Sequence, residues 1–357
     1  MTSPLAIVCP FCAIHCDDVV FEPDYPLGRI NVTDCGKAVN GFRSLSDSPP
    51  VARLGSEPMA KDAIFDFAAD CFASRSCLNV ATCGTDLSTA RTLQTLVRLG
   101  KIKLWIDETV SEAAWRTATN REGNVTATIG DIRRHADLIW LIGDLTGSYP
   151  RLLTRLEAQK KQVIASEKLD GETLAEWFYQ LRKSASNQSD QLTSAICRSS
   201  YLAIVIGPNA FESKEAMSVA SLLLKMVWYL NQTQRAVTLH IDRAATNRSL
   251  TAWRSNASLP SITDPMLCEE SIDIRLGNAL FDKRRASLQI GGFDDGVSMA
   301  QAYLPASTVG IDTTAMTIRG DSTVSLSLEK RIETSNQTTG ALLEILLGPR
   351  QPDIDSH

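Results

Sequence analysis

Apolar residues occur along this chain in short continuous runs, which alternate with stretches that have the spacing of a helix. Continuous apolar runs that alternate with helices are typical of parallel strands buried on both faces of a sheet. The pattern therefore predicts an α/β fold. The runs that predict strands are residues 78–82, 102–106, 138–142, 162–165, 202–207 and 237–242.

Capping residues mark where several helices begin and end. Asp86 precedes a helical stripe that stops at Gly100, and these two residues suit an N-cap and a C-cap. Residues 216–230 place their apolar side chains on one face of a second helix. We expect another helix over 151–160, and short strands or a hairpin over 309–328, where apolar and polar residues alternate.

Together these elements predict two doubly wound, Rossmann-like units with parallel sheets, preceded by a small cysteine-rich segment. Pro49-Pro50 marks the end of that segment, because proline continues neither a helix nor a strand ladder. The expected division is a cysteine-rich, metal-binding-like segment at 1–50, a first α/β domain at 51–200, a second α/β domain with C-terminal strands at 201–345, and a disordered tail at 346–357.

The composition of the chain argues against membrane and nucleic-acid partners. Its 357 residues contain no run of the roughly 18 apolar residues that a membrane span requires. The N-terminus also lacks the basic start of a signal peptide, so we expect a soluble, cytoplasmic protein with no membrane partner. A formal net charge of −5 and a pI near 5.5 argue against a nucleic-acid binder, which usually has a basic face.

Four of the nine cysteines form the most specific motif in the sequence. Cys9, Cys12, Cys16 and Cys35 are spaced so that they can converge on one metal. All-thiolate ligation favours a 4Fe–4S cluster, while a structural zinc and an empty relic remain open. The other five cysteines are expected to be ordinary buried side chains: Cys71, Cys77, Cys83, Cys197 and Cys268.

Two polar loops follow predicted strands. Gly84-Thr85-Asp86 and Gly143-Asp144 stand at the carboxyl ends of strands, where open α/β sheets bind ligands. Neither loop has a phosphate-binding glycine motif, so we expect closing turns. His15 is expected to be a neutral bystander, and the sequence contains no GxSxG or HExxH motif of a hydrolase.

The segment Cys9-Pro10-Phe11-Cys12-Ala13-Ile14-His15-Cys16-Asp17-Asp18, with Cys35-Gly36-Lys37 after it, resembles the N-terminal cluster segment of pterin-dependent molybdenum and tungsten oxidoreductases. It is most similar to the B-type subunits of formylmethanofuran dehydrogenase and to their shorter homologues in the bacterial formyltransferase/hydrolase complex. Three later segments are similar to loops of that family, at residues 106–111, 143–151 and 304–312. The resemblance implies a truncated molybdopterin oxidoreductase fold.

This chain differs from the family pattern at the position of the metal-ligating residue. In catalytic members a cysteine or selenocysteine binds molybdenum or tungsten, and the matching position here is Ala113, whose methyl group cannot ligate a metal. The resemblance therefore implies no catalytic residue in this chain and no molybdenum or tungsten pterin. Lys37 matches a family lysine that lies between cluster and pterin, and without a pterin we expect its charge to be solvated at the surface.

The function implied by the resemblance is a non-catalytic subunit of a formyltransferase/hydrolase complex in tetrahydromethanopterin- and methanofuran-linked oxidation of formaldehyde to formate. Its expected partners are an A-type hydrolase subunit, a D-type formyltransferase subunit, a C-type subunit and the methanofuran-type cofactor that the complex carries. Two alternatives remain. One is a B-type subunit of formylmethanofuran dehydrogenase with an iron–sulfur cluster and a molybdenum or tungsten pterin, and the other is a stand-alone iron–sulfur or zinc-stapled binding protein.

Overall fold

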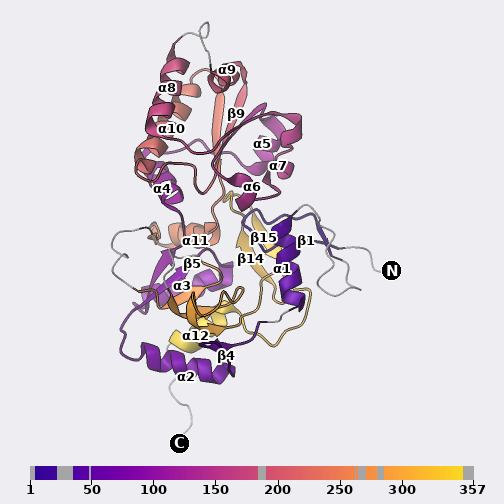
Figure 1. Cartoon of the computed structure of the whole chain (residues 1–357), viewed down its shortest axis with the longest axis vertical. Helices are drawn as coiled ribbons and strands as arrows, with labels where there is room; N and C mark the ends of the chain where they lie inside the picture. Colours follow the sequence, from indigo (N-terminus) through magenta and orange to yellow (C-terminus); the bar gives the residue numbers. More distant parts are fainter. Residues whose placement is uncertain are drawn as a thin grey trace, which may run out of the picture. The chain divides into compact units, whose positions relative to one another are not determined.

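The computed structural model describes residues 5–21, 35–47, 50–183, 190–261, 263, 271–279 and 285–348. Over these residues the chain has a mixed α/β fold with two largely parallel sheets (Figure 1). Backbone contacts divide the chain into two compact units. Unit 1 comprises residues 1–32, 38–107 and 243–357, and unit 2 comprises residues 33–37 and 108–242.

These units do not follow the division expected at residue 200, which falls within unit 2. The chain leaves unit 1 after Asp107 and returns at Arg243, so unit 2 is largely an insertion. Local apolar patterns cannot show this, because the division depends on which distant strands pair. The doubly wound, Rossmann-like form of the units stays a prediction.

Unit 1 is built on a seven-stranded sheet with the order β4-β3-β13-β12-β11-β5-β6. The strands from β13 to β6 run parallel, whereas β3 is antiparallel to both of its neighbours. The strand bounds are β3 Arg53–Leu54, β4 Glu57–Pro58, β5 Leu78–Thr82, β6 Ile102–Ile106, β11 Ile274–Leu276, β12 Ala286–Ile290 and β13 Ala300–Leu304.

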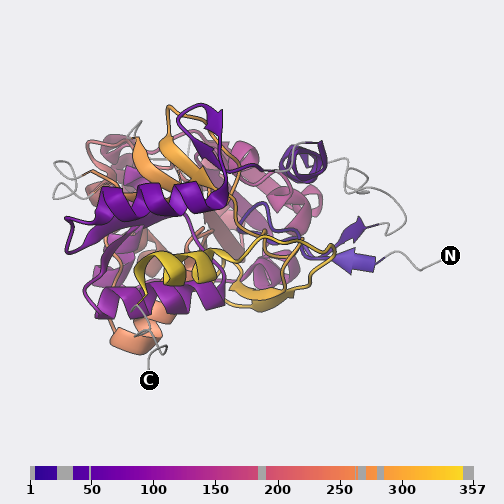
Figure 2. The ribbon, with the colours of Figure 1, turned by 90° about the horizontal axis from the view of Figure 1, so that it is seen from below.

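Three helices cover one face of this sheet. They are α2 (Lys61–Phe72), α3 (Leu87–Arg98) and α12 (Thr339–Leu347), and Figure 2 shows α12, in yellow, between the two others. Their buried side chains form one apolar cluster with alternate residues of the strands, because successive strand residues point to opposite faces. A fourth helix, α11 (Ala245–Ser255), packs beside α3.

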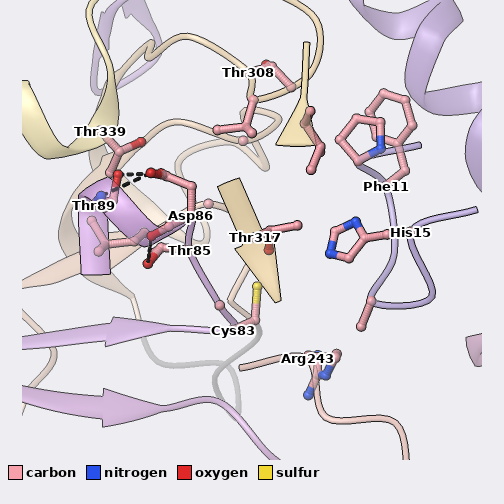
Figure 3. A pocket seen from close by; sticks show the side chains of 18 of the residues that line it. Phe11, His15, Cys83, Thr85, Asp86, Thr89, Arg243, Thr308, Thr317 and Thr339 are labelled. Atoms are coloured by element: carbon pink, nitrogen blue, oxygen red, sulfur yellow. Dashed lines mark hydrogen bonds between the residues drawn. The ribbon is translucent and has the colours of Figure 1, made fainter. Parts of the chain in front are cut away.

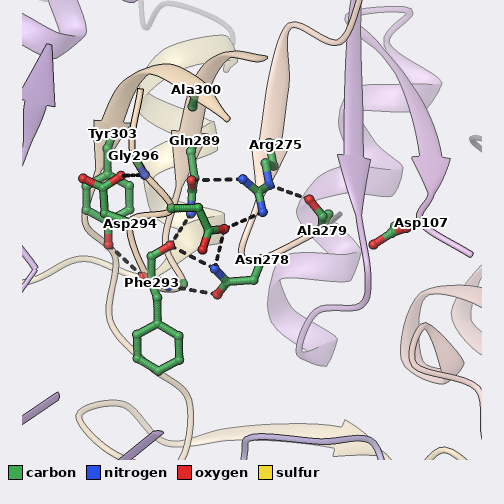
Figure 4. A network of polar contacts seen from close by, with 12 residues as sticks. Asp107, Arg275, Asn278, Ala279, Gln289, Phe293, Asp294, Gly296, Ala300 and Tyr303 are labelled. Carbon is green, nitrogen blue, oxygen red and sulfur yellow. Dashed lines mark hydrogen bonds and ion pairs between the residues drawn. The ribbon is translucent and has the colours of Figure 1, made fainter. Parts of the chain in front are cut away.

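The strand residues that point the other way include a network of buried polar groups (Figure 4). Arg275 is fully buried, and its guanidinium donates to the Asp295 carboxylate at 2.6 Å and to the carbonyl of Ala279. Arg53 forms two hydrogen bonds of 2.7 Å with Asp294. The two arginines thus hold the neighbouring carboxylates of the loop that follows β12.

The described residues of unit 1 also form two hairpins and most of one helix. Strands β1 (Leu5–Ile7) and β2 (Val19–Phe21) pair antiparallel, and α1 spans Gly36–Asp47. The hairpin expected within 309–328 is confirmed as β14 (Ala315–Ile318) and β15 (Ser325–Leu328).

Unit 2 has a four-stranded parallel sheet with the order β10-β9-β7-β8. Its bounds are β7 Leu138–Ile142, β8 Gln162–Ser166, β9 Tyr201–Ile206 and β10 Arg235–His240. The buried side chains of four helices pack together with those of β7 and β9. These are α4 Val110–Glu122, α8 Gly171–Arg182, α9 Gln191–Arg198 and α10 Ala216–Leu230, and the remaining helices are α5 Ile129–His135, α6 Leu145–Ser148 and α7 Leu152–Arg155.

The six strands predicted from apolar runs are confirmed as β5 to β10, with bounds that differ by two residues at most. The prediction of one continuous helix over 151–160 is wrong. It divides into α7 and a short 3₁₀ turn at Ala158–Lys160, because Glu157 between them adopts a left-handed conformation with φ of 50°. Most of the predicted C-terminal tail lies outside the described residues. In the described part of the chain, no helix is long and apolar enough to cross a membrane.

Replacement of Asp295 by alanine should lower the free energy of unfolding by about 3 kcal/mol, because it leaves the buried Arg275 charge with neutral acceptors alone. The matched control is Glu333→Ala, which removes a surface partner of Lys330 and should cost less than about 1 kcal/mol. Urea unfolding of both variants measures the difference. Equal losses would contradict the importance of the buried pair.

The pair formed by Arg53 and Asp294 should make stability depend on pH in acid. Burial alone would raise the pKa of Asp294, but the Arg53 hydrogen bonds and the Gly296 N–H outweigh burial and hold this pKa below its ordinary value of 3.8. The pair therefore stabilises the fold above pH 3.8, and this contribution disappears as the pH falls through the lower, folded-state pKa. The difference in Tm between wild type and Asp294→Asn should be constant near neutral pH and shrink below about pH 4. A difference that stays constant down to about pH 2 would count against this pair.

Candidate functional site

A cavity of about 330 Å³ lies at the carboxyl edge of the parallel strands in unit 1 (Figure 3). Cys83 and Gly84 follow β5, Gly277 follows β11, and Gly292 follows β12. β6 lies on one side of β5, and β11 to β13 lie on the other, so the strand order reverses at β5. Crevices at such a reversal are where open α/β sheets bind ligands, and this volume suits a small molecule.

The cysteine loop, residues 9–16, forms a second wall of the cavity. Cys9 N–H donates to the carbonyl of Cys16 at 2.8 Å, and His15 N–H donates to the carbonyl of Cys12 at 3.0 Å. His15 has a φ of 46°, and its Nδ1 lies 3.1 Å from the carbonyl oxygen of Cys9. Its ring therefore braces the loop from within while it faces the cavity (Figure 3).

Aromatic contacts fix the position of the cysteine loop. The Phe11 ring meets Phe42 of α1 edge-on at 4.9 Å and stacks with Phe293 at 6.3 Å between ring centroids. Gly41 permits this approach, because a Cβ at that position would lie 2.5 Å from the Phe11 ring. The N–H of Gly320 in the loop of the β14–β15 hairpin donates to the carbonyl of Ala13 at 2.7 Å.

All four predicted metal ligands lie among the described residues. Cys9 and Cys16 are buried in the loop and Cys12 lines the cavity, whereas Cys35 is grouped with unit 2. Among the described residues, no three His, Cys, Asp or Glu side chains are placed to hold a metal ion. The iron–sulfur or zinc site stays a prediction, which metal analysis of anaerobically prepared protein would test.

The ionised groups of the cavity are engaged with the protein itself. Asp86 is the N-cap of α3, as expected, and its carboxylate accepts from the N–H groups of Ser88 at 2.8 Å and Thr89 at 3.0 Å. Arg243 donates to the carbonyl of Asp107 at 3.1 Å and lies 3.7 Å from its carboxylate. Because Asp86 already fills the N-terminus of α3, a phosphate would be repelled from that position.

Burial keeps two further groups of the cavity uncharged near neutral pH. It lowers the pKa of His15, and the nearby Arg319 charge acts in the same direction. It also raises the pKa of the Cys83 thiol, which makes this cysteine a weak nucleophile. In Figure 3 His15 lies on the side of the cysteine loop, while Thr85, Asp86 and Thr89 lie across the cavity.

Hydroxyl groups supply most of the remaining polar lining, from residues of strand ends, the hairpin and helices. Ser307 is 9% exposed, and its Oγ has no hydrogen-bond partner among the described residues. The Thr317 hydroxyl lies 3.1 Å from that of Thr246. The cavity can therefore hold an uncharged polar molecule by hydrogen bonds.

Several residues singled out in the sequence lie elsewhere. Lys37 is exposed, as expected, but its ammonium is not only solvated, since it donates to the carbonyl of Ser148 at 2.6 Å. Ala113 is half-buried in the first turns of α4, where Thr109 and Glu112 form a capping box. Gly143 begins a turn in unit 2, with a φ of 80°.

The loop at Gly84 to Asp86 was expected at the carboxyl end of a strand as a closing turn, and in the structure it lines the cavity. Ser307 and Thr308 lie within the segment 304–312 that resembles a family loop, so a signal for them existed. Nothing in the local sequence marked Arg243, Thr317 or Thr339. The expectation that all scattered cysteines are buried is wrong, since Cys197 is exposed, Cys71, Cys77 and Cys83 are half-buried, and Cys268 lies outside the described residues.

No protein-family model and no curated protein matches this sequence. The fold, in contrast, matches 44 chains of solved structures. One is a chain in the X-ray crystal structure of the formyltransferase/hydrolase complex (FhcABCD) from Methylorubrum extorquens in complex with methylofuran. The two chains are 15% identical, with a TM-score of 0.63, and the match covers 83% of this chain and 97% of that chain. At this identity the likeness establishes a shared fold.

Cys83 should react with N-ethylmaleimide at least about tenfold more slowly than Cys197 at neutral pH, because its raised pKa leaves less thiolate and the cavity restricts access. Peptide mass spectrometry after timed labelling measures both rates. In urea the two rates should become similar, which controls for sequence effects. Equal rates in the native protein would contradict this environment of Cys83.

Proposed function

We propose that this chain is a subunit of a formyltransferase/hydrolase-type complex in one-carbon metabolism linked to methanofuran and tetrahydromethanopterin. The observation that carries the proposal is the fold match, which extends over almost the whole of a chain from such a complex. It agrees with the independent resemblance of the cysteine motif to the B-type subunits. Two signals of different kinds thus point to the same class of assembly.

Within that assembly we propose a supporting role rather than catalysis. Ala113 occupies the position that the resemblance gives to the metal-ligating cysteine, and its side chain offers no ligand. Asp86 and Arg243 of the unit 1 cavity are engaged in capping and ion pairing, and burial raises the pKa of the Cys83 thiol, which is therefore uncharged near neutral pH. The A-type hydrolase and D-type formyltransferase subunits would carry the chemistry, together with the C-type subunit and the methanofuran-type cofactor.

The test is to isolate the tagged chain from its source and measure its assembly state by native mass spectrometry. The expected result is a hetero-oligomer in fixed stoichiometry that contains a hydrolase and a formyltransferase subunit. A monomer without partners would contradict the proposal and favour a stand-alone binding protein. Stoichiometric molybdenum or tungsten in a preparation that oxidises formylmethanofuran would instead favour a catalytic dehydrogenase subunit.

A second experiment tests in the assembled complex whether position 113 takes part in catalysis. Ala113→Cys restores the thiol at the family position, and Ala114→Cys is the matched control one residue further along α4. We expect hydrolase and transferase activities to stay within about twofold of wild type in Ala113→Cys, because the chemistry resides in other subunits. A loss of more than about tenfold in Ala113→Cys but not in Ala114→Cys would assign this position to the active centre.

A further inference from the structure

Two segments of unit 1 are strongly basic within an acidic protein. Residues 87–106 and 243–261 contain seven arginines and lysines and no aspartate or glutamate, although the whole chain has a net charge of −5. The first segment holds α3 and β6, and the second holds α11, which packs beside α3. The fold brings two of the seven, Arg98 and Arg254, to one groove, whereas Arg243 lines the candidate site. Figure 1 shows α3 and α11.

Between α3 and α11 lies a groove of about 320 Å³. Leu104 of β6 and Leu259 contribute apolar surface, Val97 adds to it, and Arg98 and Arg254 are the charged residues of its lining. These two arginines come from the two different helices. The groove thus combines an apolar interior with two cations.

Neither cation of the groove has an ionic partner among the described residues. In that part of the chain, Arg254 has one hydrogen bond, to the neutral Gln94 amide at 3.4 Å, and Gln94 is in turn held by Thr251 at 2.9 Å. Arg98 stands in the last turn of α3, where a positive charge interacts favourably with the helix dipole, and none of the ion pairs among the described residues includes it. Within the described ranges, both guanidinium groups therefore lack a carboxylate partner.

One apolar side chain of the lining is also partly exposed. Val97 is 41% exposed, and Leu99, which follows α3, is 51% exposed. Exposed apolar side chains beside arginine are typical of protein-binding surfaces, where arginine is among the residues that contribute most of the affinity. The apolar interior of the groove favours a side chain over a nucleic-acid backbone.

We propose that the groove between α3 and α11 is a docking site for an acidic segment of a partner protein. Two carboxylates of that segment would pair with Arg98 and Arg254, and an apolar side chain between them would pack on Leu104 and Leu259. This inference rests on the proposed function only in that the partner would be another subunit of the same complex. The argument for an acidic partner uses only the two arginines of this chain and not the proposed function.

The first test measures binding of a fluorescein-labelled peptide in which glutamates flank a leucine, by anisotropy on the full-length protein. The double variant Arg98→Gln, Arg254→Gln should weaken binding about tenfold or more and flatten its dependence on salt. Lys214→Gln, an exposed cation of unit 2, is the matched control and should bind like wild type. Thermal unfolding confirms that each variant is folded.

Three outcomes of this experiment would overturn the proposal. One is equal binding by wild type and the double variant. Another is stronger binding of a polyuridine RNA than of the peptide, which would make the groove a nucleic-acid site. The third is a large gain in peptide affinity when residues 349–357 are removed. This segment contains Asp353 and Asp355, so such a gain would mean that the chain's own C-terminal segment occupies the groove.

A second test uses the complex isolated from the source. If wild type carries partner subunits and the double variant loses one of them, the groove is an intersubunit contact. If both proteins retain all subunits, the docking proposal fails while the proposed function stands. If wild type is monomeric, the proposed function fails, and the peptide measurement alone decides the role of the groove.

Discussion

The pairing of β5 with β11 is the interaction on which unit 1 and its cavity depend. It joins residues 194 positions apart in the sequence, since Asn79 N–H donates to the Asp273 carboxylate at 2.8 Å while Asp273 N–H donates to the Asn79 carbonyl at 2.9 Å. This pairing places the strands that follow Arg243 on the opposite side of β5 from β6. The loops after β5 and β11 consequently meet at one edge, and the cavity opens between them.

The cavity is defined more by shape than by charge. Asp86 and Arg243 are both occupied within the protein, and the burial of His15 and Cys83 suppresses their ionisation. Its cysteine-loop wall is positioned by Phe11, whose stacking partner Phe293 sits beside the carboxylates held by Arg53 and Arg275. The buried polar network on the sheet therefore supports the cysteine loop at a distance.

The strands that could be predicted from the sequence differ in polarity from the strands that could not. β5 to β10 are largely apolar, and most are buried on both faces, so each is visible as a continuous apolar run. β11 is only three residues long and has the fully buried Arg275 at its centre, and β12 buries Gln289. Polar residues that are satisfied by distant partners resemble surface residues in a sequence, so neither these strands nor Thr317 and Thr339 of the cavity could be predicted locally. Capping signals such as Asp86 are local and were therefore predictable.

The insertion of unit 2 affects the order in which the protein can form during its synthesis. Almost all of unit 2 is contiguous, so its sheet is complete once β10 has left the ribosome. Unit 1 at that stage has only β3 to β6 of its large sheet, and β5 still presents an unpaired edge. The growing chain must keep that edge from wrong partners until β11 arrives. The contact between Arg243 and Asp107, which ties together the two points where the chain crosses between the units, shortens the loop that β11 must close.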